Sequence, residues 1–175
     1  MRRCLPIVLV VALAPAAALV ALVAFPAHAD VSGPVCVTDG DTLVVNSKRQ
    51  RTPCVGGTRV RLFGIDAPEL KQKCRYLSVR DFLCGRAAAA ILLEHVRGHP
   101  VECRGNSEDK YGRLIAICYV HGKDLNAMMV SRGWALAYRD YSEKYVPQEN
   151  AAREARRGIW AMEFVPPWKW RRGKR

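Results

Sequence analysis

Residues 61–69 read Arg-Leu-Phe-Gly-Ile-Asp-Ala-Pro-Glu, and the interpretation of the whole chain starts from this stretch. An apolar run rich in β-forming residues ends at Asp66, and Pro68 then bends the chain. Arg61 lies inside the run, and Glu69 follows the proline. A cation and two carboxylates therefore gather at the end of a strand, where a metal and a phosphate could bind. The alternative is a strand, a proline turn and three solvated charges.

The alternation of side chains along a strand makes a further prediction about this stretch. On an unbroken strand Arg61 and Asp66 point to opposite faces. They can share one site only if the strand twists or bulges between them. Gly64 is the residue that permits such a break. The sequence therefore predicts a distortion at Gly64.

The hydrophobic pattern predicts several short strands and three helices. The strand segments are 35–45, 58–65, 101–103 and 114–120, and 134–138 is either a final short strand or a buried segment. The helices are 85–97, a short helix capped by Asp124, and 147–157. The first helix should bury a stripe formed by Ala89, Leu92, Leu93 and Val96. Short strands that close on themselves around an inserted helix predict an α+β fold, a small Greek-key barrel of the OB type.

The first 29 residues have the order of a secretory signal peptide. A basic start is followed by an apolar stretch from Leu5 to Phe25 and by Ala27-His28-Ala29, which is a small-x-small cleavage site. An uncleaved membrane anchor is the alternative, because the apolar stretch is longer than usual. Cleavage would remove Arg2 and Arg3 and lower the formal net charge from +12 to +10. We expect an exported protein, periplasmic or secreted, with a polyanionic partner such as nucleic acid.

The cysteines that follow the leader favour disulfide bonds over a zinc site. An even number in an exported chain indicates a disulfide framework, and no Cys-x-x-Cys occurs. Two pairings suggest themselves across hairpins, Cys36 with Cys54 and Cys103 with Cys118, and Cys74 with Cys84 could close a loop. The sequence leaves the connectivity open.

Three short motifs occur in a fixed order. They are Asp-Gly-Asp-Thr at 39–42, the stretch at 61–69, and Asp-Lys-Tyr-Gly-Arg at 109–113. Each is weak alone, but together, at compatible spacing, they are specific. From about residue 35 to residue 160 the chain resembles the thermonuclease family, typified by staphylococcal nuclease.

The resemblance implies a five-stranded OB-fold-like β-barrel with three helices, and we expect this domain to span 30–165. The basic, Trp-containing tail at 166–175 lies outside the resemblance. It also implies a calcium-dependent endonuclease that acts on DNA and RNA. Nothing in the sequence demands an obligate protein partner, so we expect a monomer. The implied Ca²⁺ ligands are Asp41, Asp66 and the backbone carbonyl of Ala67, with Asp39 supporting the loop.

The remaining roles also come from the resemblance. Arg61 and Arg113 would clamp the scissile phosphate, and Glu69 would activate water. The substrate-binding residues would be Lys110, Tyr111 and Tyr138, with Tyr141 as a weaker candidate for the last. The chemistry agrees, because calcium prefers oxygen ligands and paired guanidinium groups match phosphate oxygens.

Two other functions are compatible with a basic OB-fold. One is a nucleic-acid-binding module without catalysis, and the other is a cell-surface binding module. Neither needs the arginines and carboxylates together. For the tail, the alternatives are a solvated end whose tryptophans pack on the domain, or an additional contact to nucleic acid by charge and stacking.

Overall fold

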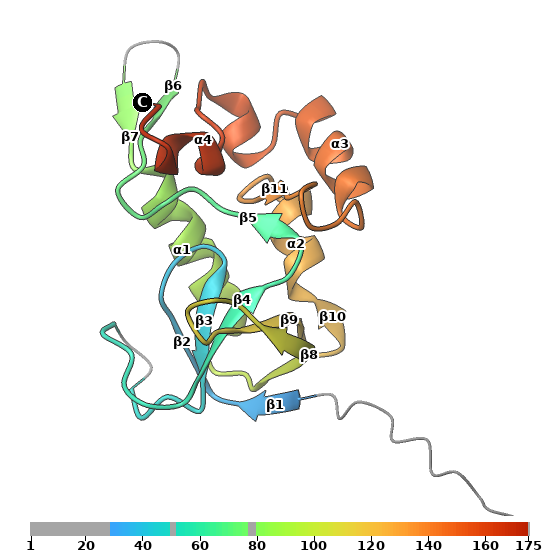
Figure 1. Ribbon diagram of the computed structural model, residues 1–175. Coiled ribbons are helices and arrows are strands. Elements are labelled where there is room, and N and C mark those ends of the chain that lie inside the picture. Colours follow the sequence, from blue (N-terminus) through green and yellow to red (C-terminus); the bar gives the residue numbers. More distant parts are fainter. Residues whose placement is uncertain (1–28, 50–51, 77–79, 175) are drawn as a thin grey trace, which may run out of the picture.

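The computed structural model describes residues 29–49, 52–76 and 80–174, and its main feature is a curled sheet of seven strands (Figure 1). The strand order is β1-β8-β9-β4-β3-β2, with β10 paired to β9. Neighbours are antiparallel except β4 and β9, which run parallel. The strands are β1 (Ala29–Gly33), β2 (Val35–Val37), β3 (Thr42–Val45), β4 (Thr58–Leu62), β8 (Val101–Glu108), β9 (Leu114–Val120) and β10 (Lys123–Asp124).

The first and last strands in this order, β1 and β2, are consecutive in the chain and are separated by one residue, Pro34. β1 pairs with β8 and β2 pairs with β3, so one bent strand contacts both edges of the sheet. Proline has no backbone N–H to donate to a neighbouring strand, so it is tolerated at such a break, where the pairing is interrupted. Counted as one bent strand, β1 and β2 join β3, β4, β8 and β9 to give five strands, the number that the resemblance implies. The segment 35–45, predicted as one strand, forms two strands, β2 and β3, that pair with each other. The sequence pattern had not indicated β1, and the short β10 is a further addition.

The helix α1 (Cys84–Val96) lies between β4 and β8 in the chain and covers the barrel core. Its buried side is formed by Ala88, Leu92 and Val96, whereas Ala89 and Leu93 are only partly buried. The helical spacing of the predicted stripe is therefore correct, but the most buried line of residues runs through Ala88 rather than Ala89. Leu43, Val60 and Leu62 supply the facing core residues from the sheet.

Two small sheets lie outside the barrel. The strand β5 (Ile65–Asp66) pairs with β11 (Leu136–Ala137), where the sequence predicted a short final strand or a buried segment. The strands β6 (Cys74–Tyr76) and β7 (Arg80–Phe82) form a hairpin in a segment that the sequence suggested was a loop.

The C-terminal part is helical. Besides α2 (Leu125–Ser131) and α3 (Val146–Glu154), it contains a 3₁₀ turn η1 (Gly158–Ala161) and a short helix α4 (Pro167–Arg171). Asp124 caps α2 as predicted, since its side chain accepts the Ala127 N–H at 2.9 Å. The helix α4 is additional to the three predicted helices, and it forms from the tail that lay outside the predicted domain.

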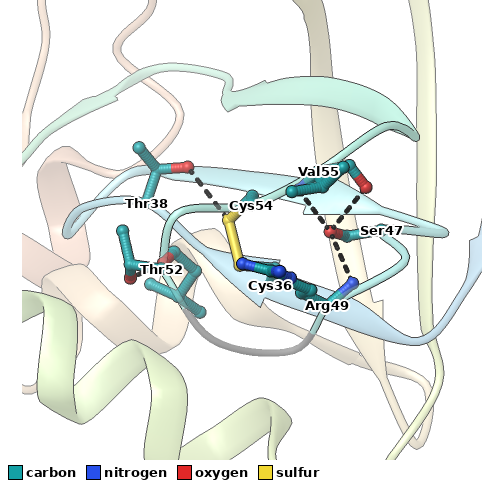
Figure 2. The surroundings of a disulfide bond; sticks show 8 residues. Cys36, Thr38, Ser47, Arg49, Thr52, Cys54 and Val55 are labelled. Carbon is teal, nitrogen blue, oxygen red and sulfur yellow. Dashed lines mark hydrogen bonds between the residues drawn. A yellow bond between two sulfur atoms is a disulfide. The ribbon is translucent and has the colours of Figure 1, made fainter.

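Three disulfide bonds connect Cys36 with Cys54, Cys74 with Cys84, and Cys103 with Cys118. These are the pairings that the sequence suggested. Figure 2 shows the first, which joins β2 to the long β3–β4 connection. Beside it, the Ser47 hydroxyl accepts the Val55 N–H at 3.1 Å and so fixes the base of the same loop.

The predicted signal peptide lies almost entirely in residues 1–28, outside the described residues. Among the residues that the structure describes, no helix is long and apolar enough to cross a membrane.

Candidate active site

The end of β4 brings Arg61 and Asp66 together. Gly64 adopts φ +70°, a left-handed conformation that suits glycine, and it reverses the side-chain alternation between β4 and β5. The Arg61 Nη2 then donates to Asp66 Oδ1 at 2.7 Å and to the Ile65 carbonyl at 3.3 Å. The predicted distortion at Gly64 is confirmed.

The neighbouring strand supplies Asp41. Thr42 on β3 pairs with Arg61 on β4, so the residue before Thr42 lies beside the arginine side chain. The Arg61 Nη1 donates to Asp41 Oδ1, and the Ala67 N–H donates to Asp41 Oδ2 at 2.7 Å. The Asp39 side chain accepts the Asp41 N–H at 3.1 Å, which agrees with its predicted role in supporting the loop. One guanidinium thus joins a carboxylate that directly precedes β3 to a carboxylate on β5.

Burial dominates the electrostatics of these carboxylates. Asp41 is 3% exposed and Asp66 is 0% exposed. Burial raises the pKa of Asp41 to about 6, with Arg61 opposing the shift and Asp39 adding to it. Burial also raises the pKa of Asp66, against the hydrogen bond from Arg171 and the charge of Arg61. The two carboxylates raise the pKa of Arg61 even though burial acts the other way. Asp41 and Asp66 therefore depend on the neighbouring arginines, Arg61 and Arg171, to remain ionised.

Glu69 lies at the edge of this cluster, with its side chain 34% exposed. Its backbone N–H donates to the buried Gln72 side chain at 3.2 Å. Gly85, in the first turn of α1, lies so close that an added Cβ would be 1.7 Å from the Glu69 carbonyl oxygen. The position of the Glu69 backbone is therefore fixed by α1 and by Gln72, while its carboxylate reaches the cleft.

Arg113 enters the site from the turn between β8 and β9. Its Nε donates to Asp109 Oδ2 at 2.7 Å, and its Nη1 lies 3.4 Å from the Thr42 hydroxyl. The Asp109 Oδ1 accepts the backbone N–H groups of Tyr111 and Arg113 at 2.9 and 3.1 Å. Burial of the Asp109 carboxyl opposes its ionisation, but these hydrogen bonds outweigh that effect and lower its pKa.

These residues line one cleft of about 340 Å³. Those predicted from the sequence are Asp41, Arg61, Ala67, Glu69, Tyr111, Arg113, Tyr138 and the weaker candidate Tyr141. Asp66 lies beneath the cleft, bonded to Arg61. Lys110 lies beside it, with its ammonium 5.1 Å from the centroid of the Tyr111 ring.

An arginine from the C-terminal tail also lines the cleft and was not among the predicted site residues. Arg171, at the end of α4, donates to Asp66 Oδ1 and Oδ2 at 2.9 and 2.8 Å and to Glu69 Oε1 at 2.8 Å. Its sequence surroundings are a run of basic residues and tryptophans, so only the basic character of the tail could have drawn attention to it.

A divalent cation at this site would use carboxylates that the arginines already bond. Among the described residues, no group of three or more His, Cys, Asp or Glu side chains is arranged to hold a metal. Asp41 and Asp66 nevertheless offer carboxylate oxygens, which hard cations prefer, and Glu69 adds a third carboxylate beside them. Positive groups already lie against each of the three. The residues fit an oxygen-preferring cation, provided that a guanidinium gives way.

Comparison with known proteins identifies the family of this chain. Residues 59–162 match the family described as "Staphylococcal nuclease homologue". The chain belongs to the staphylococcal nuclease family. The match begins after Asp41 but contains Arg61, Asp66, Glu69 and Arg113.

Relatives extend the likeness beyond the matched residues. An "Uncharacterized endonuclease" of Escherichia coli O157:H7 is 36% identical over 151 residues, which are 83% of this chain and 88% of that protein. A "Micrococcal nuclease" of Shigella flexneri is 34% identical over 177 residues, covering 93% of this chain and 92% of that protein. The "Staphylococcal-like nuclease CAN1" of Arabidopsis thaliana is 35% identical over 120 residues, 67% of this chain and 34% of that protein. Membership of the family confirms the resemblance found from the three motifs.

Proposed function

We propose that this protein is an exported, calcium-dependent endonuclease that hydrolyses phosphodiester bonds of DNA and RNA. The observation that carries the proposal is the bridge of Arg61 to Asp41 and Asp66 in a cleft that Glu69 and Arg113 also line. Relatives named as nucleases and endonucleases support the same activity.

Two arginines are suited to hold the scissile phosphate. Arg61 pairs with Asp41 and Asp66, and Arg113 pairs with Asp109, so both arginines already line the cleft before a substrate binds. Guanidinium groups match phosphate oxygens two at a time, and negative charge grows on those oxygens in the transition state. Lysine would supply the charge without the paired geometry.

Glu69 is suited to activate the attacking water. Its backbone is fixed by Gln72 and by the first turn of α1, while its carboxylate remains partly open to solvent. An ionised carboxylate in that position can accept a proton from water as it attacks phosphorus.

Asp41 and Asp66 would hold the metal, with the carbonyl of Ala67 as the third proposed protein ligand. A bound Ca²⁺ would neutralise phosphate charge and lower the pKa of a neighbouring water. Both aspartates are buried, so the proposed ligands face the protein interior rather than bulk solvent.

The aromatic side chains would contact the nucleotide. Tyr111 is 60% exposed beside Arg113, and Tyr141, which also lines the cleft, is 65% exposed. Tyr138 lies between Tyr141 and Trp168, with ring centroids 4.9 and 5.6 Å away. Stacking on such rings binds bases with little sequence preference, which fits activity on both DNA and RNA.

Export is supported by the signal-like leader and by the three disulfide bonds. Disulfides persist in oxidising compartments and are rare in the cytosol. Cell fractionation tests this part: the mature chain should appear in the periplasm or medium, with a mass that corresponds to loss of residues 1–29.

Digestion of denatured DNA and of RNA tests the activity. Folded protein should cut both in Ca²⁺ and neither in EDTA. Binding without cutting in the Ca²⁺ lane would instead identify a nucleic-acid-binding module. The Arg61→Lys variant keeps the positive charge but loses the paired N–H donors of the guanidinium, so it should cut DNA slowly. The matched control is Arg97→Lys, at the exposed C-terminal end of α1.

A further inference from the structure

The C-terminal helix α4 is docked over the candidate active site at three points. The buried Gln72 donates to the Val165 carbonyl at 2.6 Å, just before α4 begins. Trp168 stacks on Tyr138 with an interplanar angle of 12°. Arg171 bonds to Asp66 and Glu69. In Figure 1 the helix lies near β5, whose second residue is Asp66.

Two of these contacts come from one face of α4. Trp168 and Arg171 are three residues apart, so both point from the same side of the helix. Trp168 also belongs to a hydrophobic cluster with Cys74, Cys84, Leu136 and Ile159. Packing of Trp168 therefore holds the helix in place, and this position of the helix backbone puts the Arg171 side chain against the carboxylates of Asp66 and Glu69.

Arg171 and Arg61 together occupy both oxygens of Asp66. Arg61 and Arg171 both donate to Oδ1, and Arg171 also donates to Oδ2. A cation that binds Asp66 directly must take the place of at least one of these donors. Arg61 is the more enclosed of the two, with its side chain 18% exposed against 37% for Arg171. Arg171 is thus the donor that can leave.

We propose that Arg171 is a resident counter-ion of the metal site: it holds Asp66 and Glu69 in the metal-free protein, and a divalent cation must displace it. This inference rests on the proposed function, because it concerns the affinity of the same site for its metal. The guanidinium and the cation compete for one carboxylate, so the measured affinity equals the intrinsic affinity multiplied by the fraction of molecules in which Arg171 has left.

Calcium binding to the full-length mature chain, measured by titration calorimetry after metal removal, tests the competition. Arg171→Ala should lower the Kd for Ca²⁺ by about tenfold. Arg171→Lys should lie between the two, because an ammonium keeps the charge but lacks the fork that spans Asp66 and Glu69. The titrations are run in about 0.15 M salt, where the Debye length is about 8 Å and distant charge effects are screened.

Arg172→Ala is the matched control, since it removes the same charge one residue further along and Arg172 is exposed. It should leave the Kd close to that of the wild type. An equal fall in Kd for Arg172→Ala would mean a general charge effect and would overturn the proposal. An unchanged or higher Kd for Arg171→Ala would overturn it as well, since Arg171 would then support the metal site.

The outcomes separate this inference from the proposed function. If the wild type binds Ca²⁺ and digests DNA while Arg171→Ala binds with the same affinity, only the inference fails. If no variant binds Ca²⁺, both the calcium dependence and the inference fail.

Discussion

Gly64 lies against the ring of Tyr145, so that a Cβ added to Gly64 would be 3.3 Å from two of the ring carbons. Tyr145 is fully buried, and its hydroxyl donates to Asp124 at 3.0 Å, so the ring has little freedom to move. The backbone at Gly64 is therefore constrained twice, by its positive φ and by its neighbour. The same residue sets the directions of Arg61 and Asp66.

We expect Gly64→Ala to lower the free energy of unfolding by about 1–3 kcal/mol, the usual cost of a left-handed non-glycine residue, with crowding against Tyr145 in addition. It should also reduce nuclease turnover, because a shift in β5 moves Asp66. Urea unfolding and initial rates on denatured DNA measure the two effects.

Gly122→Ala is the matched control for that substitution. Gly122 has φ +71°, and nothing lies within 4 Å of an added Cβ. It should show the backbone cost without loss of activity. Equal stability and equal activity in the two variants would contradict the role given to the Gly64 turn.

The elements predicted best were those with a local physical cause. The break at Gly64 followed from strand alternation, and the cap of α2 followed from Asp124 before an apolar run. The pairing of Cys103 with Cys118 followed from a hairpin that sets the two residues opposite each other. In each case the decisive interaction is between residues whose relation can be read along one element or across one turn.

The elements that were missed depend on partners far away in the chain. Residues 29–33 have no strong β pattern and form β1 only because the edge of β8 is available to them. Arg171 contacts Asp66 across 105 residues, and nothing near Arg171 distinguishes it from the other basic residues of the tail. The three motifs predicted which side chains would gather, but not the helix that packs over them.

Glu69→Gln should lower turnover by about 10²–10⁴-fold, the range found when a general base is removed. The amide keeps the size of the side chain but cannot accept the proton from water. Initial rates at saturating Ca²⁺ measure the effect, and far-UV circular dichroism checks the fold. Glu154→Gln, at the exposed end of α3, should behave like the wild type. A rate near that of the wild type for Glu69→Gln would remove Glu69 from the mechanism.

Asp109→Asn should weaken the hold on Arg113 and change the pH dependence of stability. The pKa of Asp109 is lower in the folded protein than its ordinary value of 3.8, so the ionised carboxylate stabilises the fold above that pH. The stabilisation is lost as the pH falls through the lowered pKa. At pH 7 the variant should be less stable by about 1.5–3 kcal/mol, the usual value of a hydrogen bond to a charged group.

Urea unfolding between pH 7 and pH 3 measures this difference, which should shrink at the acid end. Asp140→Asn, at an exposed position after β11, is the control and should follow the wild type throughout. A constant difference between Asp109→Asn and the wild type across the whole range would show that the lost stability does not come from the charge of Asp109.

The three disulfides should be reduced in an order set by access. Reduction begins when a thiolate reaches a sulfur, so burial protects the bond. Cys74, Cys84, Cys103 and Cys118 are all buried, whereas Cys54 is partly exposed on the loop that Figure 2 shows. Dithiothreitol added to the native protein, followed by timed alkylation and peptide mass mapping, should label Cys36 and Cys54 first. Earlier labelling of Cys103 and Cys118 would mean that β8 and β9 separate in the native protein before the β3–β4 loop opens.

The Cys36→Ala/Cys54→Ala variant should lose about 2–4 kcal/mol of stability while keeping the other two bonds.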